Sequence, residues 1–200
     1  MESYSTIIVA FLTGVLGPIL VILVKNKIAS NKPVTDILSD SLRIGELVTN
    51  KIDQIKEEYK ADRVWITQFH NGGHFYPTGK SIAKFSVIYE AVSINTNSIQ
   101  TNFQNIPVNL FTKSMNRLLD KDIIEIPDYE DDTVATYGLK YIAQDTNCKS
   151  GYLFAIKTLD DKFIGILGLD YTKKKVRLTP NQVIELAMDS SVLGGTLISN

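Results

Sequence analysis

The stretch Ser150–Ile198, SGYLFAIKTLDDKFIGILGLDYTKKKVRLTPNQVIELAMDSSVLGGTLI, decides the fold of this chain. It contains two runs, Gly151–Thr158 and Phe163–Tyr171, that are rich in β-branched and aromatic residues, as strands are. Asp160-Asp161-Lys162 lies between the runs and predicts a tight turn. The stretch therefore predicts an antiparallel hairpin.

Helices are predicted on both sides of the strands. After the hairpin, Thr179 and Pro180 supply a cap and a first-turn proline for a helix over Asn181–Ile198. Near the N-terminus, apolar residues recur every three or four positions over Asp36–Lys60, which indicates an amphipathic helix. This helix could pack on its own sheet or against a second copy of the chain. Its apolar positions are Ile37, Ile44, Val48, Ile52, Ile55 and Tyr59.

The middle of the chain alternates between the two element types. Arg63–Phe69 (RVWITQF) reads as a strand, and His70–His74 reads as the loop that ends it. The further predicted elements are a strand at Ser86–Val92, a helix at Pro107–Leu119, a strand at Ile123–Ile126 and a helix at Thr133–Asn147. Interleaved helices with a terminal hairpin predict an α+β fold in which helices flank one antiparallel sheet.

The first residues have a different character. Ser3–Val24 contains no charged residue, and a helix of this length spans a bilayer core of about 30 Å. A signal peptide would carry positive charge before its apolar core, whereas here Glu2 precedes it and Lys25 follows it. We therefore expect a transmembrane anchor at residues 1–28, a linker at 29–35 and a cytoplasmic domain at 36–200, with the N-terminus outside.

Composition excludes several classes of function. The net charge is −1 and the basic residues are scattered, so nucleic acid is not an expected partner. Cys148 is the only cysteine, which excludes an intrachain disulfide and any multi-cysteine metal site. No nucleophile-and-base motif, phosphate-binding glycine loop or zinc spacing is present. We therefore do not expect an enzyme.

The closing part of the chain resembles a GAF domain, a small-molecule sensor fold related to PAS domains. The resemblance rests on the strand Gly165-Ile166-Leu167-Gly168-Leu169, the approach Leu178-Thr179-Pro180 to the last helix, and the helix and strand before His70. It implies a GAF-like fold over residues 36–199. The NKFDE motif of cyclic-nucleotide-binding members is absent, and Cys148 is followed by Lys149 rather than by the histidine of phytochrome-type attachment sites. The resemblance therefore does not indicate a particular cofactor. The compact layout also resembles that of small phage-encoded membrane proteins.

Gln68–Lys80 (QFHNGGHFYPTGK) is the least ordinary segment, with two histidines, paired glycines and two aromatics. In a GAF-like arrangement it would lie near the mouth of the ligand cavity. Its histidines could contact a ligand, bind a metal, act in acid/base chemistry or belong to a structural loop. No partner set for a metal is visible, so no metal site is expected. The candidate ligand-binding residues are His70, Asn71, His74, Tyr76 and Lys80, together with Trp65, which fills the core or walls a pocket.

Two other features have simpler interpretations. Asp128 to Asp132 is an acidic run that could bind divalent ions, although a solvated loop is the simpler reading. Cys148 is expected to be a small, partly buried residue.

Taken together, these patterns predict a membrane-tethered sensory module that binds a small molecule or a partner protein and signals through its long helices. One alternative is a membrane-tethered interaction scaffold whose cavity is closed and which could act as a homodimer. Another is an unrecognised enzyme that uses His70 and His74, with Asp128 as a further suspect.

Overall fold

The computed structural model describes residues 14, 16–30, 37–75, 77–131 and 139–199. The chain divides into two compact units, Met1–Asp40 and Ser41–Asn200. In the first unit, helix α2 covers Gly17–Ser30. The predicted membrane span Ser3–Val24 falls in part on residues 1–13 and 15, which lie outside the described residues, as do residues 31–36 of the predicted linker. None of the helices described here combines the length and apolar character needed to cross a membrane.

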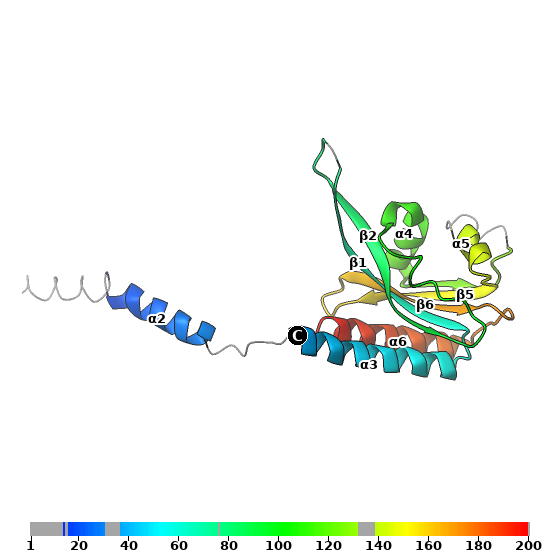
Figure 1. The fold of residues 1–200 in the computed structure, drawn as a ribbon, viewed down its shortest axis with the longest axis horizontal. Coiled ribbons are helices and arrows are strands. Elements are labelled where there is room, and N and C mark those ends of the chain that lie inside the picture. The colour runs from blue at the N-terminus through cyan, green and yellow to red at the C-terminus, as the bar shows by residue number, and fades with distance from the viewer. Residues whose placement is uncertain (1–13, 15, 31–36, 76, 132–138, 200) are drawn as a thin grey trace, which may run out of the picture. The chain divides into compact units, whose positions relative to one another are not determined.

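The second unit is built on one antiparallel sheet of six strands in the order β3-β2-β1-β6-β5-β4 (Figure 1). Every neighbouring pair in the sheet is antiparallel. The strands are β1 Arg63–His74, β2 Ser81–Val92, β3 Ile106–Pro107, β4 Ile123–Ile126, β5 Ser150–Lys157 and β6 Phe163–Tyr171. This arrangement confirms the predicted α+β fold.

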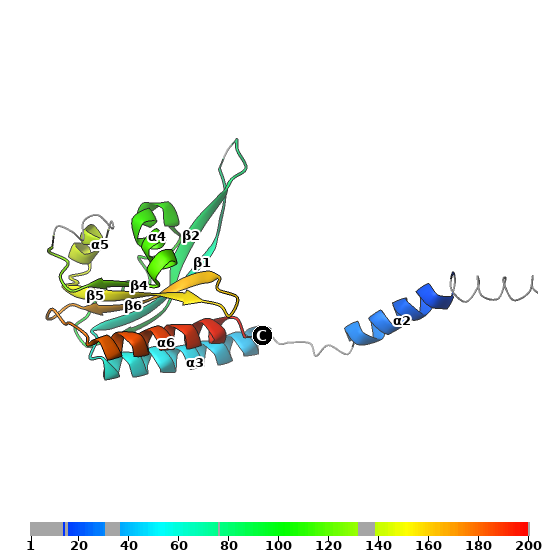
Figure 2. The same cartoon turned by 180° about the vertical axis from the view of Figure 1, so that it is seen from behind.

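Helices cover both faces of the sheet, as Figures 1 and 2 show from opposite sides. The long helices α3 (Ile37–Glu58) and α6 (Pro180–Leu197) lie on one face. The short helices η2 (Val108–Phe111), α4 (Thr112–Lys121) and α5 (Lys140–Asp145) lie on the other face. The sheet is therefore the middle of three layers and separates two hydrophobic cores.

The core under α3 and α6 explains why these helices form. Val48, Ile52 and Ile55 repeat at helical spacing on α3 and are fully or almost fully buried. Burying a side chain of this size stabilises the fold by roughly 1.5–3 kcal/mol. At the start of α6, the Thr179 hydroxyl accepts a hydrogen bond from the Gln182 backbone N–H, and the Gln182 side chain accepts one from the Thr179 backbone N–H at 2.9 Å. This reciprocal cap confirms the predicted start of the last helix.

The predicted end of the first strand was wrong. β1 continues through His74 and pairs with β2, which begins at Ser81, so the two strands form a long hairpin that projects from the sheet (Figure 1). Asn71 pairs with Ala83 and His74 with Ser81, and an irregularity between these pairs accommodates the two glycines. The segment read as a loop because its residues are polar. Backbone hydrogen bonds hold this part of the hairpin together. Most of its side chains are exposed, so the sequence shows no alternation of apolar and polar residues that would predict a strand.

Other boundaries differ less. β6 has the predicted bounds. The helix predicted at Pro107–Leu119 begins as the 3₁₀ turn η2 and continues as α4. Of the helix predicted at Thr133–Asn147, the structure describes α5, while residues 132–138 lie outside the described part.

Candidate functional site

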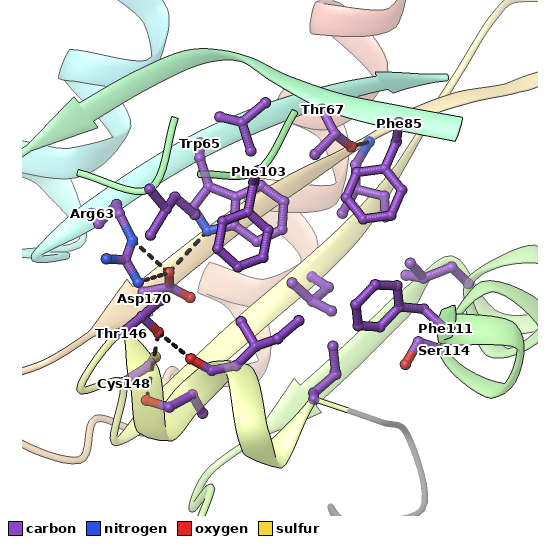
Figure 3. A pocket seen from close by; sticks show the side chains of 18 of the residues that line it. Arg63, Trp65, Thr67, Phe85, Phe103, Phe111, Ser114, Thr146, Cys148 and Asp170 are labelled. Atoms are coloured by element: carbon purple, nitrogen blue, oxygen red, sulfur yellow. Dashed lines mark hydrogen bonds and ion pairs between the residues drawn. The ribbon is translucent and has the colours of Figure 1, made fainter. Parts of the chain in front are cut away.

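A largely apolar cavity lies between the sheet and the helices α4 and α5 (Figure 3). Its volume is about 70 Å³, which is room for a few water molecules. Strands β1, β2, β5 and β6 supply one wall, and helices α4 and α5 supply the opposite wall. The aromatic residues that line the cavity are Trp65, Phe85, Phe103, Phe111 and Tyr129. Such a lining suits a ligand with a flat apolar body.

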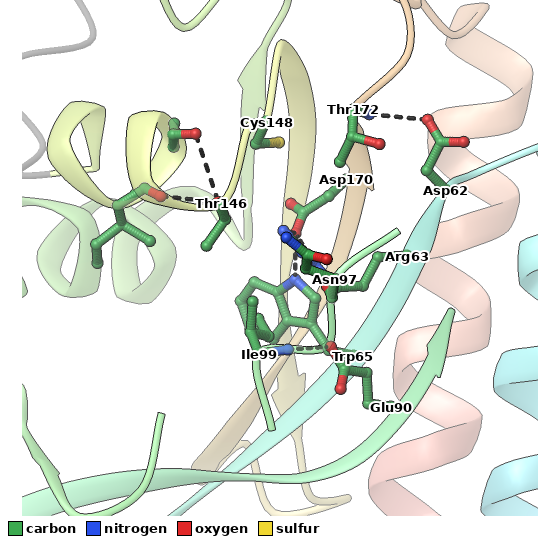
Figure 4. A network of polar contacts seen from close by, with 12 residues as sticks. Asp62, Arg63, Trp65, Glu90, Asn97, Ile99, Thr146, Cys148, Asp170 and Thr172 are labelled. Atoms are coloured by element: carbon green, nitrogen blue, oxygen red, sulfur yellow. Dashed lines mark hydrogen bonds and ion pairs between the residues drawn. The ribbon is translucent and has the colours of Figure 1, made fainter. Parts of the chain in front are cut away.

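One end of the cavity is polar because it contains a buried ion pair (Figures 3 and 4). The Arg63 guanidinium donates to Oδ2 of Asp170 from Nε at 2.8 Å and from Nη2 at 2.6 Å. The Trp65 indole N–H donates to the same oxygen at 2.9 Å. Arg63 is 1% exposed and Asp170 is 5% exposed. Water screens such a pair poorly, so each charge depends on the other.

The segment after β2 closes one side of the cavity and is tied down by hydrogen bonds. Arg63 Nη1 donates to the backbone carbonyl of Asn97 at 2.9 Å. The Glu90 carboxylate accepts from the backbone N–H groups of Ile99 at 2.8 Å and Gln100 at 3.2 Å (Figure 4). These bonds place Ile99 and the nearby Phe103 against the cavity. Arg63 therefore contacts both Asp170 and the covering segment.

Tyr129 and Cys148 lie at the same polar end and are uncharged at neutral pH. Burial raises the pKa of the Tyr129 hydroxyl well above its usual value, and the negative charge of Asp170 adds to the increase. Burial and the negative charge of Asp170 likewise raise the pKa of the Cys148 thiol. The Cys148 thiol donates to the Ser150 carbonyl, with 3.2 Å between sulfur and oxygen. A protonated, hydrogen-bonded thiol is a poor nucleophile.

The predicted site residues are not gathered at this cavity. Trp65 lines it and is half-buried. His70, Asn71, His74 and Lys80 are exposed residues of the projecting hairpin, and none of them lines the cavity. Tyr76 lies outside the described residues.

The exposed hairpin residues make local contacts. His70 Nε2 lies 2.9 Å from the Ser86 hydroxyl, and the Asn71 side chain accepts from the Gly73 backbone N–H at 3.1 Å. Asn71 thereby stabilises the turn at Gly73, whose φ of +100° favours glycine. These contacts are of the kind that a structural loop makes.

The acidic run holds a surface ion pair. Lys175 Nζ lies 2.8 Å from a carboxylate oxygen of both Asp128 and Glu130, and its hydrogen bond lowers the pKa of Asp128. Across the described part of the chain, no group of three or more His, Cys, Asp or Glu side chains could hold a metal ion.

The sequence patterns did not single out three residues of the polar end as site residues. Tyr129 stands inside the acidic run that we read as a solvated loop, yet it is only 7% exposed. Asp170 is the one charged residue of the apolar strand FIGILGLDY, and Arg63 begins the strand RVWITQF. A lone charge in an apolar strand, and an aromatic between acidic residues, were the available signals.

Comparison with known proteins identifies the fold. No family model matches the sequence, and no curated protein matches it either. A far-red cyanobacteriochrome photoreceptor superposes with a TM-score of 0.62 at 15% identity, covering 86% of this chain and 94% of that chain. The phycocyanobilin-bound GAF domain of a cyanobacterial phytochrome gives a TM-score of 0.59 at 18% identity, covering 78% and 85%.

A third similar structure comes from a different kind of protein. The GAF domain region of a predicted membrane protein from Geobacter sulfurreducens PCA superposes with a TM-score of 0.57 at 12% identity, covering 82% of this chain and 98% of that one. These sequence identities are low, so the likeness concerns the backbone arrangement. The sheet order and helix layers described above are accordingly those of a GAF fold.

Proposed function

We propose that this domain is a sensory module that binds a small organic molecule in the cavity between the sheet and helices α4 and α5. The observation that carries the proposal is an apolar cavity that ends in a buried, hydrogen-bonded ion pair. Apolar walls give affinity through burial, and a few placed polar groups select among ligands. The structurally similar photoreceptors support a sensory role for the fold.

A bilin does not fit this cavity as it stands. A linear tetrapyrrole is several rings long, whereas the cavity of about 70 Å³ is roughly half the size of an engineered cavity of about 150 Å³ that binds benzene. The Cys148 thiol is protonated and bonded to Ser150, so it is not prepared for covalent attachment. The proposed ligand is therefore a smaller molecule, held without a covalent bond.

The central strands offer a route from the cavity to the long helices. Side chains alternate along β1, so Trp65 faces the cavity while Val64 and Ile66 pack in the core under α3 and α6. The two helices are also joined by an ion pair, in which Lys51 Nζ of α3 lies 2.6 Å from Asp189 Oδ1 of α6. A ligand that shifts β1 would therefore change the packing of both helices, and the output would be their altered arrangement.

We also propose that residues before the domain tether it to a membrane, on the basis of the uncharged segment Ser3–Val24. Carbonate extraction of membranes from cells that express the full-length chain tests this proposal. Retention in the pellet would support the tether. Release into the supernatant would contradict it, and would leave ligand binding unaffected.

Ligand binding can be followed through Trp65, because it is the only tryptophan of the chain and lines the cavity. A library of neutral, anionic and cationic molecules of one ring or less would be titrated into the full-length protein. We expect binders to change the Trp65 emission and to raise Tm. Failure of every compound on both measurements would contradict a ligand-binding function.

Ala143→Leu is expected to abolish that binding. Ala143 is buried on α5 and lines the cavity, so a larger side chain there takes up the ligand's space. The substitution should cost about 1–3 kcal/mol through overpacking, which a urea unfolding curve measures. Ala83→Leu is the matched control, since Ala83 is exposed on the hairpin. Equal binding by both variants would place the ligand elsewhere.

A further inference from the structure

The Tyr129 side chain is largely buried, and its hydroxyl has no hydrogen-bond partner within the described part of the protein. Tyr129 is 93% buried and lines the cavity, and among the described residues no hydrogen bond involves its hydroxyl. Two threonines that also line the cavity do have partners: Thr67 accepts from the Ile166 N–H at 3.1 Å, and Thr146 donates to the Ile142 carbonyl at 2.7 Å. A hydroxyl of a cavity-lining residue that bonds to no protein group is available to donate to and accept from a ligand.

The second oxygen of the Asp170 carboxylate borders the same space as this hydroxyl. A Cβ placed on Gly151 would stand 3.2 Å from the Tyr129 hydroxyl and 3.3 Å from Asp170 Oδ1, so both atoms border the space above this glycine. The three N–H donors from Arg63 and Trp65 all reach the other oxygen, Oδ2. Asp170 and Tyr129 both line the cavity, so a ligand there can meet an acceptor, Oδ1, and a hydroxyl that can donate and accept.

The charge of the cavity opposes an anionic ligand. Of the twenty residues that line it, Arg63 and Asp170 are the only charged ones, and their charges cancel. Arg63 already makes three bonds, two to Asp170 and one to the Asn97 carbonyl. A carboxylate on the ligand would face Asp170 Oδ1 at short range in a poorly screened site. An uncharged polar group is the better match.

The walls limit the size and shape of the ligand. Trp65, Phe85, Phe103 and Phe111 surround the apolar part, and flat rings stack on or against such side chains. The volume is about half that of a cavity that binds benzene, so the lining must move outward for one ring to enter. Met115 is a lining residue that can provide this movement, since methionine changes rotamer readily.

We propose that the cavity binds an uncharged, one-ring aromatic molecule that carries a hydroxyl or amino group, of the phenol or aniline type. This inference rests on the ligand-binding function proposed above. The ligand's O–H or N–H donates to Asp170 Oδ1, and its heteroatom accepts from the Tyr129 hydroxyl. The ring lies among the aromatic side chains.

Matched pairs of compounds test the inference on the full-length protein. Phenol and toluene have the same size, and phenol alone can hydrogen-bond; benzamide and benzoate also match in size, and benzoate alone is an anion. With Trp65 emission as the readout, we expect phenol to bind roughly tenfold more tightly than toluene, and benzamide more tightly than benzoate. Preference for toluene or for benzoate would overturn the inference while leaving a ligand-binding function in place. If no member of the wider library binds, both proposals fail.

Tyr129→Phe separates a ligand contact from a structural role. Removing a hydroxyl that has no protein partner should leave the Tm of the free protein unchanged or higher, and should reduce the preference for phenol over toluene to about twofold or less. Tyr89→Phe is the matched control, because Tyr89 packs on the opposite face of the sheet. A Tyr129→Phe variant that keeps the full phenol preference would overturn the inference, even if it is less stable.

Discussion

Asp170→Asn is expected to lower the free energy of unfolding by about 3–5 kcal/mol, because it leaves the charge of Arg63 buried without its counter-ion. Asparagine has nearly the same shape, so the loss is electrostatic rather than steric. Arg63 is 1% exposed and reaches little water that could replace the carboxylate. The same change weakens the hydrogen bond that Trp65 donates to Oδ2. Urea unfolding of the full-length protein at neutral pH measures the effect.

Two variants serve as controls for this result. Asp160→Asn removes a carboxylate that pairs with Lys162 at 2.6 Å on the exposed hairpin turn, and no measurable loss is expected there. The double variant Arg63→Met/Asp170→Asn removes both charges, and we expect it to recover much of the lost stability. If Asp170→Asn costs no more than Asp160→Asn, the ion pair is not a determinant of the fold.

The layers of this fold could be predicted from local patterns, because each element carries its own signal. The apolar spacing of Val48, Ile52 and Ile55 indicates α3 from the sequence alone, and these residues are buried in the core. The strand Phe163–Tyr171 was predicted with its observed bounds. Such signals reflect how often side chains return to the same face of a helix or strand. This period does not depend on distant parts of the chain.

The cavity could not be predicted in the same way, because its residues meet only in the folded chain. Arg63 and Asp170 are separated by 107 positions, and antiparallel pairing of β1 with β6 sets them opposite each other. Composition drew attention to the segment around His70 and His74, which the structure places on the exposed hairpin instead. Tyr129 lies among acidic residues, which indicate a solvated loop. A charged stretch does not show that one side chain within it points into the core.

Gly194→Ala is expected to destabilise the protein by about 3 kcal/mol or more, because no space exists for a Cβ at this position. Gly194 lies in α6 where the helix crosses the end of β5, and its Cβ would stand 2.0 Å from the backbone oxygen of Lys157. A backbone atom cannot rotate away, so α6 must move off the sheet and loosen the core that it covers. Gly195 is the matched control, since a Cβ there meets nothing within 4 Å. Alanine is a better helix former than glycine, so Gly195→Ala should stabilise the protein by roughly 0.5–1 kcal/mol. Thermal and urea unfolding of the two variants should therefore give shifts of opposite sign, and a similar shift in both would mean that α6 does not pack on β5 as closely as described.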